Sequence, residues 1–443
     1  MVTIKNREVL VRISGAELLL DAIETALKAA DPYNAVMSKV KLRGDYVEVE
    51  GKRVEVRGRI HVLGFGKASA RMAEALVEIF GDLIAGGVVI TPTGGNRVGP
   101  VEVLKGNHPI PGEDTLKASK RLLEYLQGVG EGDVVFVAIS GGGSALFEVP
   151  EEGVELGEIA KLSDELMGRG ADIVELNAVR KRLSAVKGGK LLRYIKARRV
   201  VSLIVSDVVG DRLDTIASGP TAPDATDKAF AVAVLKKYGL WDSLPERLRR
   251  LIEIETPKAG DPLFDKVINV PVVNNLGSLQ KAAERLALRG YNTIILTSML
   301  EGEAREVGRV LASVIKSAAL HGFPASRPVA ILAGGETVVT VRGRGRGGRN
   351  QEMCLSLAMA IRGLNATAAC VATDGIDGNS PAAGALIDGG VVEEAERLGV
   401  NPAEYLDNND SYTFFEKLGR AIITGYTGVN VNDIFLAVVD KDK

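Results

Sequence analysis

The chain has 443 residues, a formal net charge of -2 at pH 7 and 46% hydrophobic residues. Its 55 basic residues nearly balance its 57 acidic residues, which argues against a nucleic-acid partner or an anionic membrane surface. The length predicts two domains. The chain lacks a long uncharged apolar run and begins with a polar segment, so we expect a soluble cytoplasmic protein.

Cysteine and histidine usage gives no sign of a metal site. Cys354 and Cys370 both lie in apolar surroundings, and His61, His108 and His321 are scattered along the chain. None of these residues has the spacing of zinc ligands. A reducing compartment is therefore expected.

Short apolar runs followed by helical periodicity recur along the chain, and this pattern is typical of parallel βα units. Residues 38–60 alternate charged with β-branched side chains and predict a small hairpin ahead of the first buried strand. The predicted buried strands are 60–63, 88–90, 134–139, 200–205, 270–273, 293–296, 329–333 and 368–372. The fold class is α/β.

The pattern weakens between residues 238 and 265, where three prolines stand among clustered charges. We place a domain boundary there, giving domains 1–250 and 251–443, within about 15 residues.

The first candidate loop, GFGK, follows the predicted strand 60–63 and precedes a predicted helix over 68–80. It contains Gly64, Gly66 and Lys67. The opening amides of the helix and the lysine could hold an anion together. Neither the Walker nor the dinucleotide pattern fits, because Ala68 and Ser69 occupy positions that those patterns reserve for other residues. A tight structural turn remains the alternative, although such a turn does not require the lysine.

The second loop follows the predicted strand 134–139 and consists of Ser140, Gly141, Gly142, Gly143 and Ser144. Three consecutive glycines can present successive backbone amides to a phosphate group. We favour this phosphate-binding role over a serine nucleophile, because no histidine stands in an evident triad arrangement.

The third loop, SDVVGD, places Asp207 and Asp211 after the predicted strand 200–205. Carboxylates at a strand end suggest magnesium coordination or a base that accepts a hydroxyl proton. Asp214, just downstream, is interpreted as a helix cap or turn residue. Polar residues also recur upstream at three- and four-residue spacing, which is more often a solvated face than a site; they are Asn177, Arg180, Lys181 and Ser184.

The C-terminal half carries a glycine–arginine segment, residues 343–352, with the sequence GRGRGGRNQE. Glycine lets the backbone approach a ligand, and arginine matches phosphate or carboxylate, so the segment predicts an anionic substrate. A mobile surface loop is the alternative. Further candidate positions for phosphate or metal binding lie nearby; they are Gly335, Glu336, Arg349, Asn350 and Asp374. Similar loops in both halves suggest a site in the cleft between two domains.

Taken together, these motifs resemble the glycerate 2-kinases (class II glycerate kinases), whose C-terminal half is called the multi-organism fragment with rich leucine domain. The resemblance runs from GFGKASARMAEAL through GNHPIPGEDT, ISGGGSAL, LNAVRKRLSAVKGGKL and SDVVGDRLDTIASGPTAPD to GGETVVTVRGRGRGGRNQE and ATDGIDGNSPAAGA. It implies two α/β/α domains, the first Rossmann-like with a parallel sheet and the second with a mixed sheet.

The resemblance also implies an activity: ATP-dependent phosphorylation of D-glycerate at its C2 hydroxyl, assisted by Mg²⁺ or another divalent ion. On the matching positions, catalysis is implied for Lys67, Asp207, Asp211 and Arg349. We further expect Arg180, Lys67 and Arg349 to bind the substrate, and Asp207, Asp211 and Asp374 to be the candidate metal ligands. The expected partners are small molecules, with a homodimer as an open possibility.

Three alternatives stay open. Phosphorylation at C3 would differ only in which hydroxyl faces the donor. A hydroxypyruvate reductase would need a nicotinamide cofactor, against which the serine at position 69 argues. A module that senses an anionic metabolite would bind without turnover.

Overall fold

The computed structural model describes residues 3–441, and these form two compact units. The N-terminal unit runs from Pro32 to Val272, and the C-terminal unit combines the residues up to Asp31 with those from Val273 onward. The chain therefore leaves the first unit later than the expected position 250. The reason is that β9, Val267–Val273, is the sixth strand of the first sheet.

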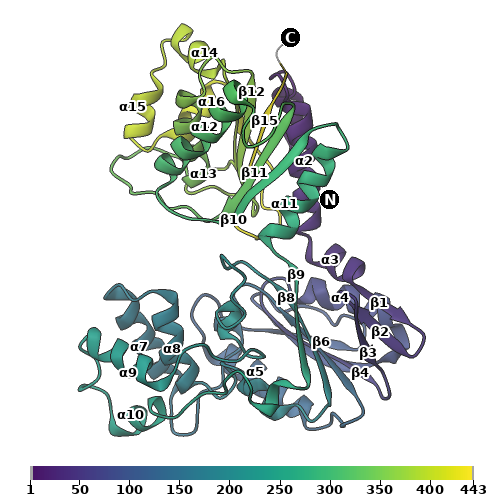
Figure 1. Cartoon of the computed structure of the whole chain (residues 1–443). Coiled ribbons are helices and arrows are strands. Elements are labelled where there is room, and N and C mark those ends of the chain that lie inside the picture. Colours follow the sequence, from purple (N-terminus) through teal and green to yellow (C-terminus); the bar gives the residue numbers. More distant parts are fainter. Residues whose placement is uncertain (1–2, 442–443) are drawn as a thin grey trace. The chain divides into compact units, whose positions relative to one another are not determined.

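The N-terminal unit is built on a six-stranded sheet in the order β6-β5-β4-β7-β8-β9, and the pairings recorded from β6 to β8 are parallel (Figure 1). Every residue of the two central strands, β4 and β7, is buried, as expected for strands covered on both faces. The order reverses between them, which creates a topological switch point. The remaining strands are β5 (Ile84–Thr91), β6 (Val101–Lys105) and β8 (Arg199–Val205), beside β4 (Ile60–Phe65) and β7 (Val134–Ile139).

Helices and short turns complete this unit around the sheet. A small antiparallel sheet precedes β4, in place of the predicted hairpin, and consists of β1 (Val40–Arg43), β2 (Tyr46–Val49) and β3 (Lys52–Glu55). The helices are α3 (Pro32–Lys39), α4 (Ser69–Phe80), α5 (Glu113–Leu126) and α6 (Gly143–Leu146). The 3-10 turns are η1 (Gly81–Leu83), η2 (Lys190–Tyr194), η3 (Ile216–Ser218) and η4 (Pro262–Phe264).

Four further helices form a layer with its own apolar core, α7 (Leu156–Gly168), α8 (Ile173–Leu183), α9 (Lys228–Lys237) and α10 (Glu246–Ile252). Helix α8 begins where Asp172 accepts hydrogen bonds from the amides of Val174 and Glu175 at 2.8 and 2.9 Å. Such a cap satisfies donors that the first helical turn leaves free. The inner face of α8 packs into the apolar core of this layer, through Leu176 and Val179 among others.

The C-terminal unit contains a mixed six-stranded sheet in the order β10-β11-β15-β12-β13-β14. Strands β10 and β11 are parallel, and β15 is inserted antiparallel between β11 and β12. The bounds are β10 (Asn292–Leu300), β11 (Val329–Gly335), β12 (Ala366–Ala372), β13 (Gly384–Asp388), β14 (Ala421–Ile422) and β15 (Asp433–Val439). The run DIFLAVV of β15 is fully buried and was not among the predicted strands.

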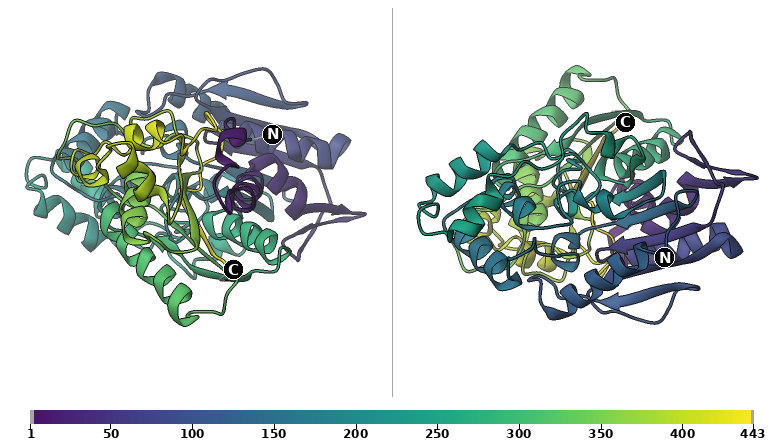
Figure 2. Two further views of the ribbon diagram at one scale, coloured as in Figure 1. Left: turned by 90° about the horizontal axis from the view of Figure 1, so that it is seen from above. Right: turned by 90° about the horizontal axis from the view of Figure 1, so that it is seen from below.

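Helices cover both faces of the C-terminal sheet. In Figures 1 and 2, α2 (Ala16–Ala29) lies beside α11 (Asn275–Ala287), and both contact the sheet. The opposite face carries α12 (Ala304–His321) and α13 (Arg349–Ala360). The shorter helices are α1 (Arg7–Leu10), α14 (Val391–Arg397), α15 (Pro402–Asp407) and α16 (Ser411–Lys417). Within residues 3–441, no helix is long and apolar enough to span a membrane.

Candidate functional site

The GFGK and SGGGS loops meet at the switch point of the N-terminal sheet. The amide of Lys67 donates to the carbonyl of Gly141 at 2.9 Å, and the amide of Ala68 donates to Oγ of Ser140 at 3.0 Å. Gly66 has φ +127°, and a Cβ there would lie 2.2 Å from Oγ of Ser140. Only glycine permits this approach. The two loops therefore form one structural element at the position where α/β sheets commonly bind ligands.

Lys67 and His108 flank the middle of the triple-glycine loop, Ser140–Ser144. Gly142 has φ +80° and precedes α6. A Cβ on this glycine would lie 2.9 Å from Nε2 of His108 and 3.5 Å from Cε of Lys67. Burial, together with the charge of Lys67, lowers the pKa of His108 below its usual 6.5. The loop thus has an ammonium group and a largely neutral imidazole beside it at neutral pH.

Asp207 lies against the same loop from the end of β8. A Cβ on Gly141 would lie 2.3 Å from Oδ2 of this carboxylate. Asp211 follows with a left-handed backbone, φ +53°. Asp214 lies in the turn before η3, and its carboxylate pairs with the Lys181 ammonium at 3.3 Å. It is a turn residue as predicted, and it does not cap a helix, because Thr215 precedes η3.

The predicted metal ligands do not assemble a metal site by themselves. Among the residues 3–441, there is no group of three or more histidine, cysteine, aspartate or glutamate side chains arranged to hold an ion. Asp207 and Asp211 belong to the N-terminal unit and Asp374 to the C-terminal unit. Magnesium often keeps only one or two protein carboxylates and takes its other ligands from water and substrate phosphates. The carboxylate of Asp207 beside the glycine loop fits that sparse kind of site.

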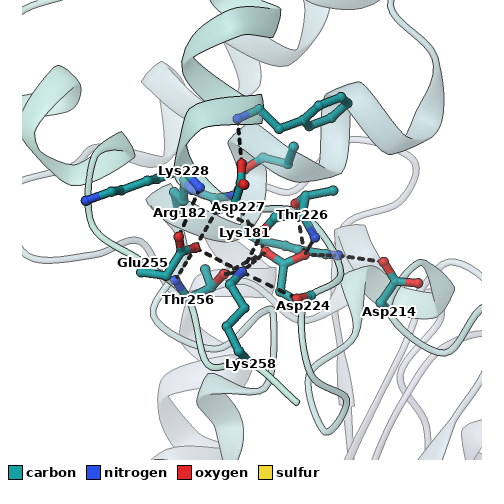
Figure 3. Close-up of polar contacts among 12 residues, drawn as sticks. Lys181, Arg182, Asp214, Asp224, Thr226, Asp227, Lys228, Glu255, Thr256 and Lys258 are labelled. Atoms are coloured by element: carbon teal, nitrogen blue, oxygen red, sulfur yellow. Dashed lines mark hydrogen bonds and ion pairs between the residues drawn. The ribbon is translucent and has the colours of Figure 1, made fainter. Parts of the chain in front are cut away.

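A buried ion-pair network fixes helix α8 (Figure 3). Lys181 pairs with Asp224 at 2.9 Å, while Arg182 pairs with Glu255 at 2.9 Å and donates to the carbonyl of Thr226 at 2.9 Å. Lys181 and Arg182 are each only 1% exposed. The interpretation of the polar stripe as a solvated face was therefore wrong: Asn177 and Ser184 are buried too, and Arg180 is half-buried.

Arg180 reaches the triple-glycine loop from α8. Its Nη2 donates to the carbonyl of Ser144 at 3.1 Å. The buried ammonium of Lys187 donates to the same carbonyl at 2.9 Å and to that of Phe147 at 2.8 Å. These two cations hold the carbonyl groups of the short helix α6, which is a favourable place for positive charge.

In the C-terminal unit, the glycine–arginine segment is held by side chains from other loops. The amides of Arg342 and Gly343 donate to Oδ1 of Asn409 at 2.7 and 2.9 Å. A Cβ on Gly345 would lie 2.3 Å from the Cβ of Asp410. The mobile-loop alternative is therefore wrong. The glycines allow close packing against the 408–411 turn, and the amides bonded in this way are occupied.

Arg349 begins α13 and lies between two carboxylates. Its Nε donates to Oδ2 of Asp433 at 2.6 Å, and its Nη1 donates to Oε1 of Glu336 at 2.6 Å. Asn350 is fully buried and donates to Oδ1 of Asp433 at 2.8 Å and of Asp377 at 3.2 Å. Glu336 and Asn350 thus belong to the group that orients the arginine. Gly335 lies at the end of β11, where a Cβ would meet the backbone of Leu300.

Burial is the largest influence on the pKa values of Asp433 and Asp377 in this cluster. It raises the pKa of Asp433 to about 7, although the Arg349 guanidinium acts in the opposite direction. Burial also raises the pKa of Asp377, against the hydrogen bonds from Gln351 and Asn350. A carboxyl group that titrates near neutral pH beside an arginine is characteristic of functional sites, and also occurs in structural ion pairs.

A cavity of about 590 Å³ adjoins this cluster. Its lining includes Gly348, Arg349, Asp374, Asp377 and Asn409. Its volume is that of a small-molecule pocket. The structure thus groups Arg349 and Asp374 at one cavity of the C-terminal unit, and Lys67, Asp207 and the triple-glycine loop at the switch point of the N-terminal unit.

Residue reasoning alone missed several polar groups that the structure places at these two locations. His108 lies in the GNHPIPGEDT motif, but its isolation from other histidines concealed it. Asp433 ends the segment TGYTGVNVND, residues 424–433, which is rich in glycine and asparagine and has no spacing that marks the acid. Lys187 is part of a KGG sequence whose burial could not be foreseen from its charge.

Comparison with known proteins agrees with both halves of this description. A family model described as a domain of unknown function (DUF4147) matches residues 18–253, and the MOFRL family model matches residues 329–433. The chain is 40% identical to a Glycerate 2-kinase of Pyrococcus horikoshii, with 96% of this chain and 98% of the relative covered. It is 41% identical to a D-glycerate 2-kinase of Thermotoga maritima, with the same coverage of 96% and 98%.

A crystal structure of a glycerate kinase from Thermotoga maritima superposes with a TM-score of 0.86 at 39% identity, covering 96% of this chain and 99% of that one. The agreement extends over both the parallel and the mixed sheet, so it confirms the predicted α/β architecture. The chain belongs to the glycerate kinase family.

Proposed function

We propose that this protein is a glycerate 2-kinase that transfers the γ-phosphoryl group of ATP to the C2 hydroxyl of D-glycerate. The observation that carries the proposal is the meeting of Lys67 with the triple-glycine loop at the switch point, in a chain about two-fifths identical to named glycerate 2-kinases over nearly its whole length. In the reaction, the C2 oxygen bonds to the γ-phosphorus, the bond from that phosphorus to the β,γ-bridging oxygen breaks, and the hydroxyl proton passes to a base.

Phosphate groups are the proposed ligands of the switch-point loops. Phosphoryl transfer depends mainly on positioning and on stabilising the charge of the phosphoryl oxygens. Lys67 supplies a positive charge beside Gly142. Gly141–Gly143 carry no side chains that would keep a phosphate from their backbone, and Gly66 and Ser140 join this loop to the GFGK loop. We assign the carboxylate of Asp207 to a divalent ion that would enter with the nucleotide and neutralise phosphate charge.

The acceptor hydroxyl needs a proton acceptor, and Asp207 or Asp211 is proposed for this role. A base must lie within hydrogen-bond reach of the hydroxyl. Both residues belong to the loop after β8, and Asp207 borders the triple-glycine loop. The proposed partners of the substrate's negative charges are Arg180 in the N-terminal unit and Arg349 in the C-terminal unit, where Asp433 and Glu336 fix the guanidinium.

The decisive experiment is incubation of the purified protein with ATP, magnesium and D-glycerate, followed by phosphorus NMR of the products. We expect 2-phosphoglycerate and ADP in equal amounts. Formation of 3-phosphoglycerate would replace the C2 assignment by C3. Thermal stabilisation by D-glycerate with no ADP formed would indicate a binding module instead.

A nicotinamide-dependent reduction of hydroxypyruvate is tested separately by following NADH oxidation. We expect none. Position 69, where a dinucleotide-binding loop requires glycine, is a serine whose hydroxyl donates to the carbonyl of Gly66 at 2.8 Å. The third glycine of that pattern permits close packing of the helix on the strand, and Ser69 replaces it here.

A further inference from the structure

A directed chain of hydrogen bonds connects the triple-glycine loop to helix α8. Oγ of Ser218 donates to Oδ1 of Asn177 at 2.9 Å. The hydroxyls of Ser144 and Ser218 are also 2.9 Å apart. Because the proton of Ser218 is already used toward the amide oxygen, Ser144 must be the donor in that contact. The amide of Asn177 is therefore oriented, with its oxygen occupied and its Nδ2 directed elsewhere.

Two buried donors beside this chain lack an acceptor in the part of the protein that the structure describes, residues 3–441. They are Nδ2 of Asn177 and Nε of Arg180. The Asn177 side chain belongs to a residue only 2% exposed, and Arg180 donates through Nη2 to the carbonyl of Ser144. The two residues lie one turn apart on α8 and are connected to Ser144, Arg180 directly and Asn177 through Ser218. Buried donors are normally paired, so these two groups remain available to the acceptor oxygens of a ligand.

The charge at this location limits the ligand. The Lys187 ammonium pairs with the buried carboxylate of Glu148 at 3.0 Å, and Arg180 interacts electrostatically with both groups. Two cations and one carboxylate leave one uncompensated positive charge. Burial lowers the pKa of Lys187 to about 8, so the lysine still carries its proton at neutral pH. A singly charged anion would neutralise the cluster.

We propose that Asn177 and Arg180, held by Ser144 and Ser218, bind the carboxylate of the acceptor acid and select for it. The inference rests on the proposed glycerate kinase activity and names the group that distinguishes glycerate from an uncharged polyol. A planar carboxylate offers two acceptor oxygens, which suits amide and guanidinium donors. Ser144 directly follows the three glycines, so an acid held here has its hydroxyl groups close to the loop proposed for phosphate.

The donor's phosphates are a poorer match for these residues. A terminal phosphate carries more than one negative charge, which exceeds the single uncompensated charge of the cluster. Asn177 contributes no charge at all, and the hydroxyl of Ser144 already donates its proton within the chain of bonds. Lys67 and the glycine amides of the loop supply the positive charge and the backbone donors that phosphate binding requires.

The sharpest variant is Asn177→Asp, which keeps the shape and the acceptor for Ser218 but replaces the two amide protons by negative charge. With the full-length enzyme, we expect the KM for D-glycerate to rise about tenfold or more, with the KM for ATP changed less than about twofold. Asn177→Ser removes the amide without adding charge and should show a smaller rise. Ser163→Ala is the matched control, since Ser163 is a buried serine of α7 whose hydroxyl donates to the carbonyl of Ile159 in the same helix.

Two further measurements separate a folding defect from lost recognition. Thermal melting reports whether each variant folds, and calorimetric titration with D-glycerate reports binding directly, without catalysis. The preference for D-glycerate over glycerol should fall in Asn177→Asp, because only the acid has a carboxylate to lose. If the wild type binds D-glycerate but forms no product, the kinase proposal fails while the carboxylate site can still be measured.

The carboxylate assignment is overturned by any of three results. One is a rise in the KM for ATP with the KM for D-glycerate unchanged, which would assign the cluster to the nucleotide. Another is loss of kcat alone, with both KM values unchanged. The third is a folded Asn177→Asp variant that binds D-glycerate as tightly as the wild type does.

Discussion

Nε of Arg349 donates to Oδ2 of Asp433 at 2.6 Å, so a buried acid holds an arginine that lines the cavity of the C-terminal unit. The two residues come from different elements, the start of α13 and the start of β15. Burial raises the pKa of Asp433 to about 7, and the anchor of Arg349 therefore changes its charge near neutral pH. Proton binding at Asp433 is linked to the orientation of Arg349.

This linkage predicts a pH dependence of the activity. The carboxylate form of Asp433 holds the guanidinium more strongly, and that form appears as pH rises through about 7. We expect kcat/KM to rise through this range, and Asp433→Asn to lower kcat/KM and flatten the rise. Initial rates measured over a pH series would show it. His108 cannot account for this rise of kcat/KM near pH 7, because its pKa lies below its usual 6.5. His108→Gln should therefore leave the pH of the rise unchanged.

Stability gives an independent check of the same titration. Since the pKa of folded Asp433 is raised above its ordinary value of 3.8, its titration favours folding fully below that value, and the benefit is lost as pH rises through about 7. Asp433→Asn does not titrate. Its free energy of unfolding, measured with denaturant, should therefore increase relative to that of the wild type as pH rises from 3.8 to about 7. A constant difference would contradict the raised pKa.

Removing either proposed catalytic cation should reduce turnover. Lys67→Met removes a charge proposed to stabilise phosphate groups, and Arg349→Met removes a proposed partner of the substrate's negative charge; losing one such group costs on the order of 10² to 10³ in kcat. Steady-state rates at saturating ATP and D-glycerate measure this. Lys120→Met and Arg309→Met remove exposed cations from the same two units and should stay near wild-type rates. Retention of wild-type kcat in Lys67→Met or Arg349→Met would remove that residue from the mechanism.

The sequence predicted the elements whose patterns are local. Fully buried strands such as β4 and β7 show as unbroken apolar runs, and in the loops that follow them the positive φ and close neighbours of Gly66 and Gly142 require glycine. By contrast, β15 is equally apolar but follows a loop rich in asparagine, and nothing local shows that it enters the middle of a mixed sheet.

Tertiary packing determines whether polar helix residues are buried and whether loop glycines serve packing or ligand binding. Polar residues at helical spacing, as in Asn177 and Lys181, usually face solvent. Here they are buried because Asp224 arrives from a loop 43 residues further on and neutralises the lysine. The glycines of the glycine–arginine segment likewise pointed to a ligand, whereas Gly345 serves packing against Asp410. Long-range partners of this kind leave no periodic signal.

The packing role of the segment can be tested at Gly348. A Cβ there would lie 2.4 Å from the backbone and carboxylate of Asp377. We expect Gly348→Ala to lower the free energy of unfolding by about 1–3 kcal/mol and to disturb Arg349, which follows it. Gly157→Ala, in α7 with open space around it, should be neutral or slightly stabilising. Denaturant unfolding of both variants compares them, and equal stabilities would exclude tight packing at position 348.

The network around Asp224 predicts a large stability effect with a defined pH dependence. Asp224 is 2% exposed and pairs with Lys181 at 2.9 Å. Although burial acts to raise it, the Lys181 charge and the surrounding hydrogen bonds bring the pKa of Asp224 below its ordinary 3.8. Asp224→Asn leaves buried cations without their counter-charge, and breaking such a pair costs about 3–5 kcal/mol. Urea unfolding near neutral pH should show this loss.

The sign of the pH effect distinguishes an ion pair from lost packing. A lowered pKa contributes stability above the ordinary value of 3.8, and this contribution disappears as pH falls through the folded-state pKa. The difference in the free energy of unfolding between the wild type and Asp224→Asn should therefore become smaller at acidic pH.

Two further variants serve as controls. Asp242→Asn changes an exposed acid in the same unit and should change stability by less than about 0.5 kcal/mol. The double variant with Lys181→Met and Asp224→Leu should recover only part of the loss, because the buried Arg182 also pairs with Asp224 at 3.6 Å and keeps only Glu255 as its counter-charge. A gap that persists unchanged in acid would mean that Asp224 acts through its shape and not its charge.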